Sequence, residues 1–132
     1  MGKRCELYVH LVWATRERDP CLDAETRAWL WPLMGDEARA RGCVWAVVGG
    51  VEDHVHVLAA MPTTMTVSDL VRHLKGWSTR AVRERGIGLR WQAGYAAFSV
   101  SPSGVPQVEA YIRGQEAHHA NGSVEGSWEW ND

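Results

Sequence analysis

The sequence predicts an α+β domain of the ferredoxin-like type, an antiparallel sheet followed by a C-terminal helix. Segments rich in β-branched and aromatic residues alternate with longer segments that carry helix caps and stops. Their order is strand, helix, strand, strand, helix, strand and a final helix. The first six elements match a split βαβ unit with both helices on one face of the sheet. We expect the other face to stay open, with the first and third strands adjacent at its centre.

The first strand and helix have clear boundaries in the sequence. Residues 7–15 (LYVHLVWAT) predict a strand. After a loop, Asp23 can cap a helix over residues 24–41 that ends at Gly42. Pro32 predicts a kink or a break within this helix, because proline lacks the amide hydrogen that an internal helical turn uses.

The rest of the chain supplies three strands and two helices. A turn rich in glycine and aspartate joins the next two strands, and Thr66 or Ser68 can cap the helix that follows. Residues 1–120 are expected to form one domain, and the acidic, Gly/Ser-containing residues 121–132 a flexible tail. The predicted elements are strands 44–51, 54–60 and 98–101, helices 67–85 and 108–119, and a turn at 103–106.

The composition excludes several classes of protein. The 132 residues fit one domain, and a formal net charge of −2 excludes binding of nucleic acid through the overall charge of the chain. Three widely spaced cysteines predict reduced thiols in the cytoplasm, not disulfides. No apolar run approaches the roughly 20 residues of a membrane span. The sequence contains no GxxxxGK[ST] loop, the motif that binds nucleotide phosphates, so no nucleotide cofactor is expected.

The first candidate motif is His54-Val55-His56. On a strand, side chains two residues apart point to the same face, so both imidazoles project together while Val55 points toward the helices. Two neutral imidazoles at this spacing can bind one divalent metal ion. Taken alone, such a pair is more often fortuitous or structural than a metal site.

The second candidate motif is the pair Tyr111 and Gln115. On a helix, residues four apart are neighbours, so a phenol and a carboxamide can face the same target. By itself, this pair is more often part of an ordinary amphipathic helix, with the tyrosine packed and the glutamine in solvent.

The third candidate feature is a basic stretch. Residues 66–90 hold six Lys or Arg and two Asp or Glu, although the whole chain is slightly acidic. A solvated helix face explains such a stretch as well as a phosphate-binding surface does. The cations expected to contact DNA are Arg72, Lys75, Arg80 and Arg83.

Five ordered blocks of the sequence resemble the single-tyrosine HUH transposases of small bacterial insertion sequences. The REP-associated tyrosine transposases belong to the same superfamily. The blocks extend over residues 7–119, and together they are far more specific than a lone histidine pair. They are HLVWATRERDP (10–20), EDHVHVLAAMP (52–62), VSDLVRHLKGWSTR (67–80), WQAGYAAFSVSPS (91–103) and VEAYIRGQEAHH (108–119).

The resemblance implies a reaction and a site. Tyr111 would attack single-stranded DNA, forming a 5′-phosphotyrosine link and a free 3′-OH, and a second 3′-OH would then reseal the strand. The divalent ion, Mg²⁺ or Mn²⁺, would bind His54, His56 and Gln115. Hairpin-bearing element ends are candidate DNA partners. The family's usual assembly is a homodimer in which the tyrosine helix of one subunit often completes the other's site.

Three further histidines and two alternative functions accompany this hypothesis. His10, on the first strand beside the third, could support the metal site or contact DNA, and a structural histidine with a local hydrogen bond explains it equally well. His118 and His119 could share the helix face of Tyr111 and support the site or contact DNA. A non-catalytic nucleic-acid-binding module is the first alternative, because the same sheet topology serves many RNA-binding proteins. The second is a domesticated transposase body, which the short acidic tail suggests.

Overall fold

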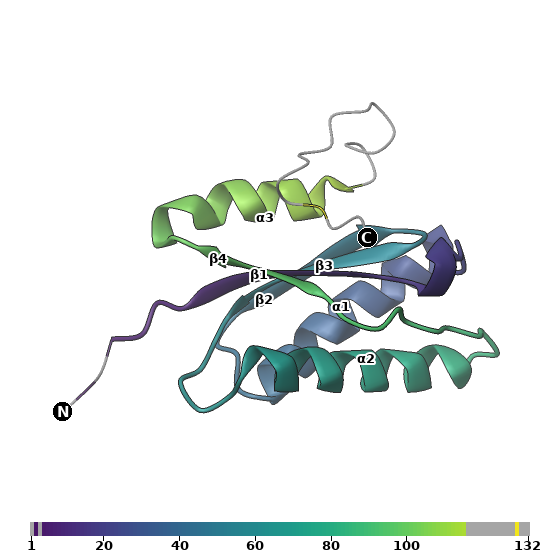
Figure 1. Cartoon of the computed structure of the whole chain (residues 1–132), viewed down its shortest axis with the longest axis horizontal. Coiled ribbons are helices and arrows are strands. Elements are labelled where there is room, and N and C mark those ends of the chain that lie inside the picture. Colours follow the sequence, from purple (N-terminus) through teal and green to yellow (C-terminus); the bar gives the residue numbers. More distant parts are fainter. Residues whose placement is uncertain (1, 3, 116–128, 130–132) are drawn as a thin grey trace.

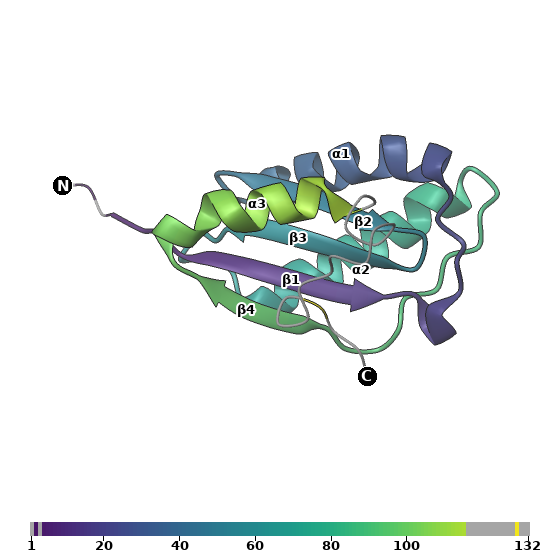
Figure 2. The same cartoon turned by 90° about the horizontal axis from the view of Figure 1, so that it is seen from above.

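The computed structural model describes residues 2, 4–115 and 129, and it confirms the predicted ferredoxin-like fold. A four-stranded sheet separates two helical layers (Figure 1). Helices α1 (Ala24–Ala40) and α2 (Val67–Arg83) cover one face, and α3 (Val105–Arg113) lies on the other. Seen from above, α3 runs along the side of the sheet formed by β2 and β3 (Figure 2).

The sheet has the predicted arrangement of strands. Its order is β2-β3-β1-β4, and all neighbouring pairs are antiparallel. The central pair is therefore β1 and β3, as the topology predicts. Strand β3 has the predicted bounds, whereas β2 begins later and β4 earlier than predicted. The strands are β1 (Tyr8–Ala14), β2 (Ala46–Val51), β3 (His54–Ala60) and β4 (Ala96–Val100).

Helix α1 begins at the predicted cap. The carboxylate of Asp23 accepts a hydrogen bond from the amide of Thr26 at 2.8 Å. The helix continues through Pro32, which confirms the predicted helix and removes the alternative of a break at this proline. Trp31 and Met34, both buried, hold this part of the helix against the core, which compensates for the one backbone hydrogen bond that proline removes. Gly42, with a φ of +121°, follows its end.

Helices α2 and α3 differ from the prediction at their ends. Thr66 caps α2 by accepting a hydrogen bond from the Asp69 amide at 3.1 Å. Helix α3 begins inside the segment predicted to be a turn, because Pro106 lies in its first turn, where no amide hydrogen is needed. It ends at Arg113 with Gly114 as its cap. Residues 116–119 of the predicted helix lie outside the described residues.

Apolar side chains pack on both faces of the sheet, so the face predicted to be open is partly covered. The larger cluster lies between the sheet and helices α1 and α2 and includes Trp13 and Val55. The smaller cluster lies beneath α3 and includes Leu58 and Ile112. None of the helices in the described part of the chain is long and apolar enough to cross a membrane.

One glycine permits the close approach of α3 to the sheet. A Cβ atom at Gly49 would lie 2.3 Å from the carbonyl oxygen of Ile112, a distance that no real contact adopts. Gly49 is the register partner of His56 on β3. The end of the tyrosine-bearing helix is therefore held against β2, beside the strand that carries the histidine pair.

Candidate active site

The two histidines of β3 project from the sheet face that α3 covers. His54 and His56 are 3% and 0% exposed, and they lie opposite Ala14 and Val12 of β1. Val55 between them packs in the main core on the other face. The period-two alternation of a strand therefore separates the core-forming side chains from the polar ones.

Tyr111 of α3 lies directly beside this pair. Its ring packs edge-on against the ring of His56, with a centroid separation of 5.8 Å, and the side chain is buried. The residues that hold it there are Val108 and Ile112 of the smaller apolar cluster, which fix one face of α3 on the sheet. A tyrosine hydroxyl is thus brought to two imidazoles of the same chain.

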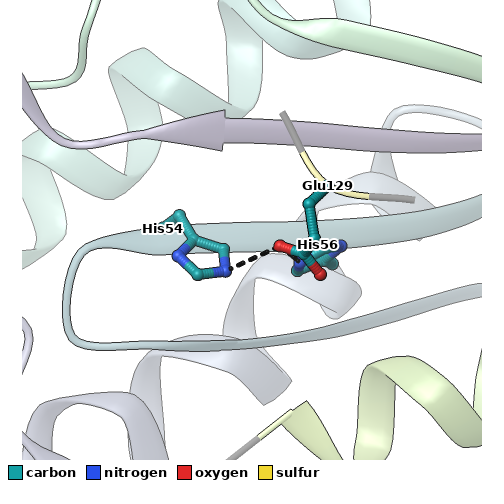
Figure 3. Close-up of side chains that lie close together, drawn as sticks. All are labelled: His54, His56 and Glu129. Carbon is teal, nitrogen blue, oxygen red and sulfur yellow. Dashed lines mark hydrogen bonds and ion pairs between the residues drawn. The ribbon is translucent and has the colours of Figure 1, made fainter. Parts of the chain in front are cut away.

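Glu129 joins the histidines and the tyrosine. One carboxylate oxygen, Oε1, lies 3.2 Å from Nε2 of His54 and 3.1 Å from Nε2 of His56 (Figure 3). The hydroxyl of Tyr111 donates a hydrogen bond to the other oxygen, Oε2. Burial of Glu129 favours its neutral form, but hydrogen bonds from His54, His56 and Tyr111 outweigh this and hold the pKa of the carboxyl well below its usual range.

Each histidine has a partner on its other ring nitrogen. Nδ1 of His56 lies 2.8 Å from Nε2 of His10, and the two rings stack with centroids 5.1 Å apart. Nδ1 of His54 lies 2.8 Å from Oδ1 of Asp53. Such partners orient an imidazole and leave its second nitrogen directed at the site. In both rings that second nitrogen is Nε2, which faces Glu129.

The surroundings of His10 and His54 shift the pKa values of these two histidines in opposite directions. Burial, reinforced by the neighbouring His56, lowers the pKa of His10 to about 3, so this ring is neutral at physiological pH. Burial also opposes the charged form of His54, but hydrogen bonds to Glu129 and Asp53 outweigh it and raise the pKa of His54. The carboxylates therefore stabilise positive charge at His54 and, by the same field, would stabilise a cation.

Arg18 adds a cation at the edge of the site. Its guanidinium lies 3.4 Å from Nδ1 of His54 and 3.8 Å from the carboxylate of Asp53. Glu17 and Arg18 both adopt positive φ values, 58° and 56°, in a short turn after β1. L-residues adopt this conformation at a cost of order 1–3 kcal/mol, and such strain clusters at functional sites. The turn places a positive side chain at the edge of the histidine site.

The donor set fits a divalent metal ion. The ligand atoms offered by His54, His56 and Glu129 all lie within 4.8 Å of one another. Two imidazole nitrogens and a carboxylate oxygen suit several divalent transition ions, and the carboxylate suits Mg²⁺ and Mn²⁺.

Gln115 lies near the site, one turn beyond Tyr111. Its side chain is 1% exposed, and its Nε2 donates a hydrogen bond to the Tyr111 carbonyl at 3.5 Å. It lines a cavity of about 480 Å³ together with Gly49 and Gly50. Its role as a metal ligand stays a prediction. His118 and His119 lie outside the described residues.

Three residues of this arrangement were not predicted from the sequence: Glu129, Asp53 and Arg18. Asp53 directly precedes the histidine motif, and Arg18 belongs to the block HLVWATRERDP, so both carried a local signal. Glu129 carried none, because an acidic residue in a Gly/Ser-containing tail has no periodicity that assigns it to a face.

Helix α2, which carries the cations expected to contact DNA, lies on the other side of the sheet from α3, the helix of Tyr111 (Figure 1). Arg72 pairs with Asp69 on an exposed face. The ammonium group of Lys75 donates hydrogen bonds to the carbonyls of Gln92 and Gly94, at 2.9 and 2.7 Å, and burial lowers its pKa. A structural role is therefore evident for Lys75.

Arg80 and Arg83 line a cavity of about 700 Å³ at the end of the sheet. The carbonyl of Arg90 accepts a hydrogen bond from the amide of Arg16 at 2.8 Å, which joins the loop before β4 to the turn that carries Arg18. Because Arg16 also lines the cavity, the cavity lies beside the turn that carries Arg18. Among the residues that the structure describes, no acidic side chain lines the cavity; the lining residues are Arg16, Lys75, Gly76, Thr79, Arg80, Arg83, Leu89, Arg90, Trp91, Gln92 and Ala93.

Comparison with known families identifies the chain. The family model described as IS200-like transposase matches residues 3–115. This protein belongs to the IS200-like transposase family. The match includes β1, the histidine pair, Tyr111 and Gln115, and it confirms the resemblance seen in the sequence.

Individual relatives agree with this assignment. The chain is 27% identical over 118 residues to the ISDra2 transposase TnpA of Deinococcus radiodurans, covering 83% of this chain and 84% of the relative. A crystal structure of a protein described as a transposase from Deinococcus radiodurans R1 matches with a TM-score of 0.66 and 28% identity, covering 87% of this chain and 95% of the other.

A REP-associated tyrosine transposase bound to a REP hairpin shares the fold. Its TM-score is 0.59 at 14% identity, and the match covers 94% of this chain and 76% of the other. At this identity the likeness shows the fold alone.

Proposed function

We propose that this transposase cleaves and rejoins single-stranded DNA through a covalent link between Tyr111 and a 5′-phosphate. The observation that carries the proposal is the position of the Tyr111 hydroxyl, which is joined to the His54/His56 pair through one carboxylate. A nucleophile and a candidate metal site within one buried cluster suit phosphoryl transfer.

A divalent ion belongs to this proposal because a free phenol is a weak nucleophile. Its pKa is about 10, so only about one in a thousand is ionised at neutral pH. When bound, a Mg²⁺ or Mn²⁺ ion would offset the charge of the scissile phosphate and help to orient it. His54 and His56 would hold the ion, with Gln115 as a further ligand on the strength of the family resemblance.

The chain's own residues would carry out the remaining steps. The Tyr111 oxygen attacks phosphorus while the bond from phosphorus to the 3′ oxygen breaks. The phenol loses its proton to a base or to water, and the departing 3′ oxygen takes one up. The product is a phosphotyrosine diester, so a second 3′-OH can reverse the reaction and join a new strand without ATP.

The proposed substrate is DNA that reaches the site past the basic cavity, the cavity of about 700 Å³ lined by Arg80 and Arg83. The structure of the REP-associated transposase of the same fold contains a bound REP hairpin, which supports a hairpin-bearing strand as the partner. Arg80 and Arg83 would bind phosphates in the basic cavity, and Arg18 would meet the strand beside His54. The homodimer implied by the resemblance belongs to the same proposal, and the mass measured by light scattering tests it.

The decisive experiment is covalent capture. Labelled single-stranded DNA carrying candidate hairpins is incubated with the protein in Mn²⁺ or in EDTA and separated on a denaturing gel. A metal-dependent adduct that is absent from Tyr111→Phe establishes the nucleophile and the reaction class. An adduct that persists in Tyr111→Phe contradicts the assignment. DNA binding without any adduct, unaffected by EDTA, would instead support a non-catalytic binding module.

A further inference from the structure

The side chain of Glu129 is enclosed although it comes from the end of the chain. It is 5% exposed, and it is the carboxylate of the His54, His56 and Glu129 cluster in the described part of the chain. Exposed acidic tails remain solvated, because burying a carboxylate requires partners that replace its water. Here both carboxylate oxygens have such partners, in the two histidines and Tyr111.

The distances around Oε1 match those between neighbouring ligands of one ion. Two ligands at about 2.1 Å from a metal, with a right angle between them, are separated by about 3 Å. Oε1 of Glu129 lies 3.2 Å from Nε2 of His54 and 3.1 Å from Nε2 of His56. The carboxylate thus occupies a ligand position relative to both imidazoles, without any rearrangement of β3.

The other candidate ligands carry no negative charge, so a carboxylate would strengthen binding of a divalent ion. His54 and His56 as ligands are neutral and comparatively soft, whereas Mg²⁺ and Mn²⁺ favour oxygen ligands that carry negative charge. Gln115 would add only a neutral amide oxygen. Oε1 of Glu129 is an anionic oxygen already in contact with both imidazoles. With this oxygen the donor set is suited to bind Mg²⁺ or Mn²⁺.

We propose that Glu129 is a ligand of the divalent ion and the acceptor that positions the Tyr111 hydroxyl. Oε1 binds the ion between the histidines, and Oε2 keeps its hydrogen bond from the phenol. The carboxylate sets the nucleophile at a fixed position relative to the ion. The inference rests on the proposed function, but binding of the ion to Glu129 can be measured without DNA.

The test is the affinity for Mn²⁺ in the absence of DNA, measured from the electron paramagnetic resonance of free Mn²⁺. The full-length wild type is compared with Glu129→Ala, Glu129→Gln and Glu109→Gln. Glu109 forms an ion pair with Arg113 on the surface of α3, so its substitution removes the same charge without touching the site. His56→Ala is the positive control, and circular dichroism checks that each variant is folded.

We expect Glu129→Ala to bind Mn²⁺ at least about 10-fold more weakly, since even residues behind the ligands typically contribute 10–100-fold. Glu129→Gln should fall between Glu129→Ala and wild type, and Glu109→Gln should match wild type. At saturating Mn²⁺ Glu129→Ala should still form the Tyr111 adduct more slowly, because the phenol has lost its acceptor, whereas the amide oxygen in Glu129→Gln can still accept from it.

Two results would overturn the proposal. One is wild-type Mn²⁺ affinity in folded Glu129→Ala. The other is faster adduct formation in that variant, which would mean that the carboxylate occupies the place of the DNA phosphate and blocks it. If Mn²⁺ affinity depends on Glu129 but wild type forms no adduct with any strand, the ligand assignment stands and the proposed nuclease function fails.

Discussion

Nε2 of His10 on β1 lies 2.8 Å from Nδ1 of His56 on β3, so the two central strands are joined by an imidazole pair at the site. A metal ion on Nε2 of His56 requires that nitrogen to be unprotonated, which places the hydrogen of the neutral ring on Nδ1. His56 then donates to His10, which accepts with Nε2. His10 is suited to this role because its low pKa keeps it neutral.

His10→Ala should therefore weaken Mn²⁺ binding by about 10–100-fold, the usual effect of removing the partner of a ligating histidine. His10→Gln keeps a side-chain acceptor and should recover part of the affinity. Mn²⁺ titration of the folded variants measures both. Equal affinity in wild type and His10→Ala would show that the pair serves only packing.

Gly49→Ala should displace the end of α3. The new Cβ atom would lie 2.3 Å from the Ile112 carbonyl oxygen, which belongs to rigid backbone. We expect destabilisation of about 1–3 kcal/mol, typical of overpacking, together with a reduced rate of adduct formation. Urea denaturation measures the free energy of unfolding.

Gly76→Ala is the matched control for Gly49→Ala. Nothing lies within 4 Å of a Cβ atom at Gly76, which is inside helix α2. Alanine is favoured over glycine in a helix interior by about 1 kcal/mol, so this variant should be more stable than wild type. Destabilisation by both substitutions would contradict the explanation from close approach.

Arg83→Gln should weaken DNA binding in a salt-dependent way. Arg83 lines the basic cavity, whereas Arg72 is paired with Asp69 on the exposed face of α2. The slope of log affinity against log salt is negative, and the loss of one phosphate contact should make it shallower by about 0.7 for a single strand. Arg72→Gln, which was also predicted to affect DNA binding, is the comparison. A larger slope change in Arg72→Gln would place the DNA on the exposed face of the helix.

Lys75→Met should destabilise the fold rather than selectively weaken DNA binding. Its ammonium group donates to the carbonyls of Gln92 and Gly94 and so fastens the loop before β4 to α2. Loss of these two bonds should cost about 1–3 kcal/mol. Thermal denaturation measures the loss, and DNA affinity at a temperature where the variant is folded should change little. A stable variant that loses salt-dependent DNA affinity would restore the predicted phosphate-binding role.

The sequence by itself determined the order of the elements, the ferredoxin-like topology and the common face of His54 and His56. Each of these depends on short-range chemistry: alternation along a strand, caps such as Asp23 and Thr66, and glycine stops. The points that the sequence left open or placed wrongly are those where local rules compete with packing. Pro32 remains inside α1 because the core holds the helix on both sides of it, and Pro106 begins α3 where a turn was expected.

The sequence already placed His10 on the strand next to the histidine pair, but only the tertiary structure decided that it contacts His56 and that Glu129 contacts both histidines. His10 is 46 residues from His56 along the chain, and Glu129 is 73 residues from it. Contacts at such separations follow from strand register and from the docking of α3, and no local pattern encodes them. Burying the carboxylate of Glu129 costs free energy unless hydrogen-bond donors replace its water. Those donors come from β3 and α3, so they surround Glu129 only after the sheet, α3 and this residue have come together.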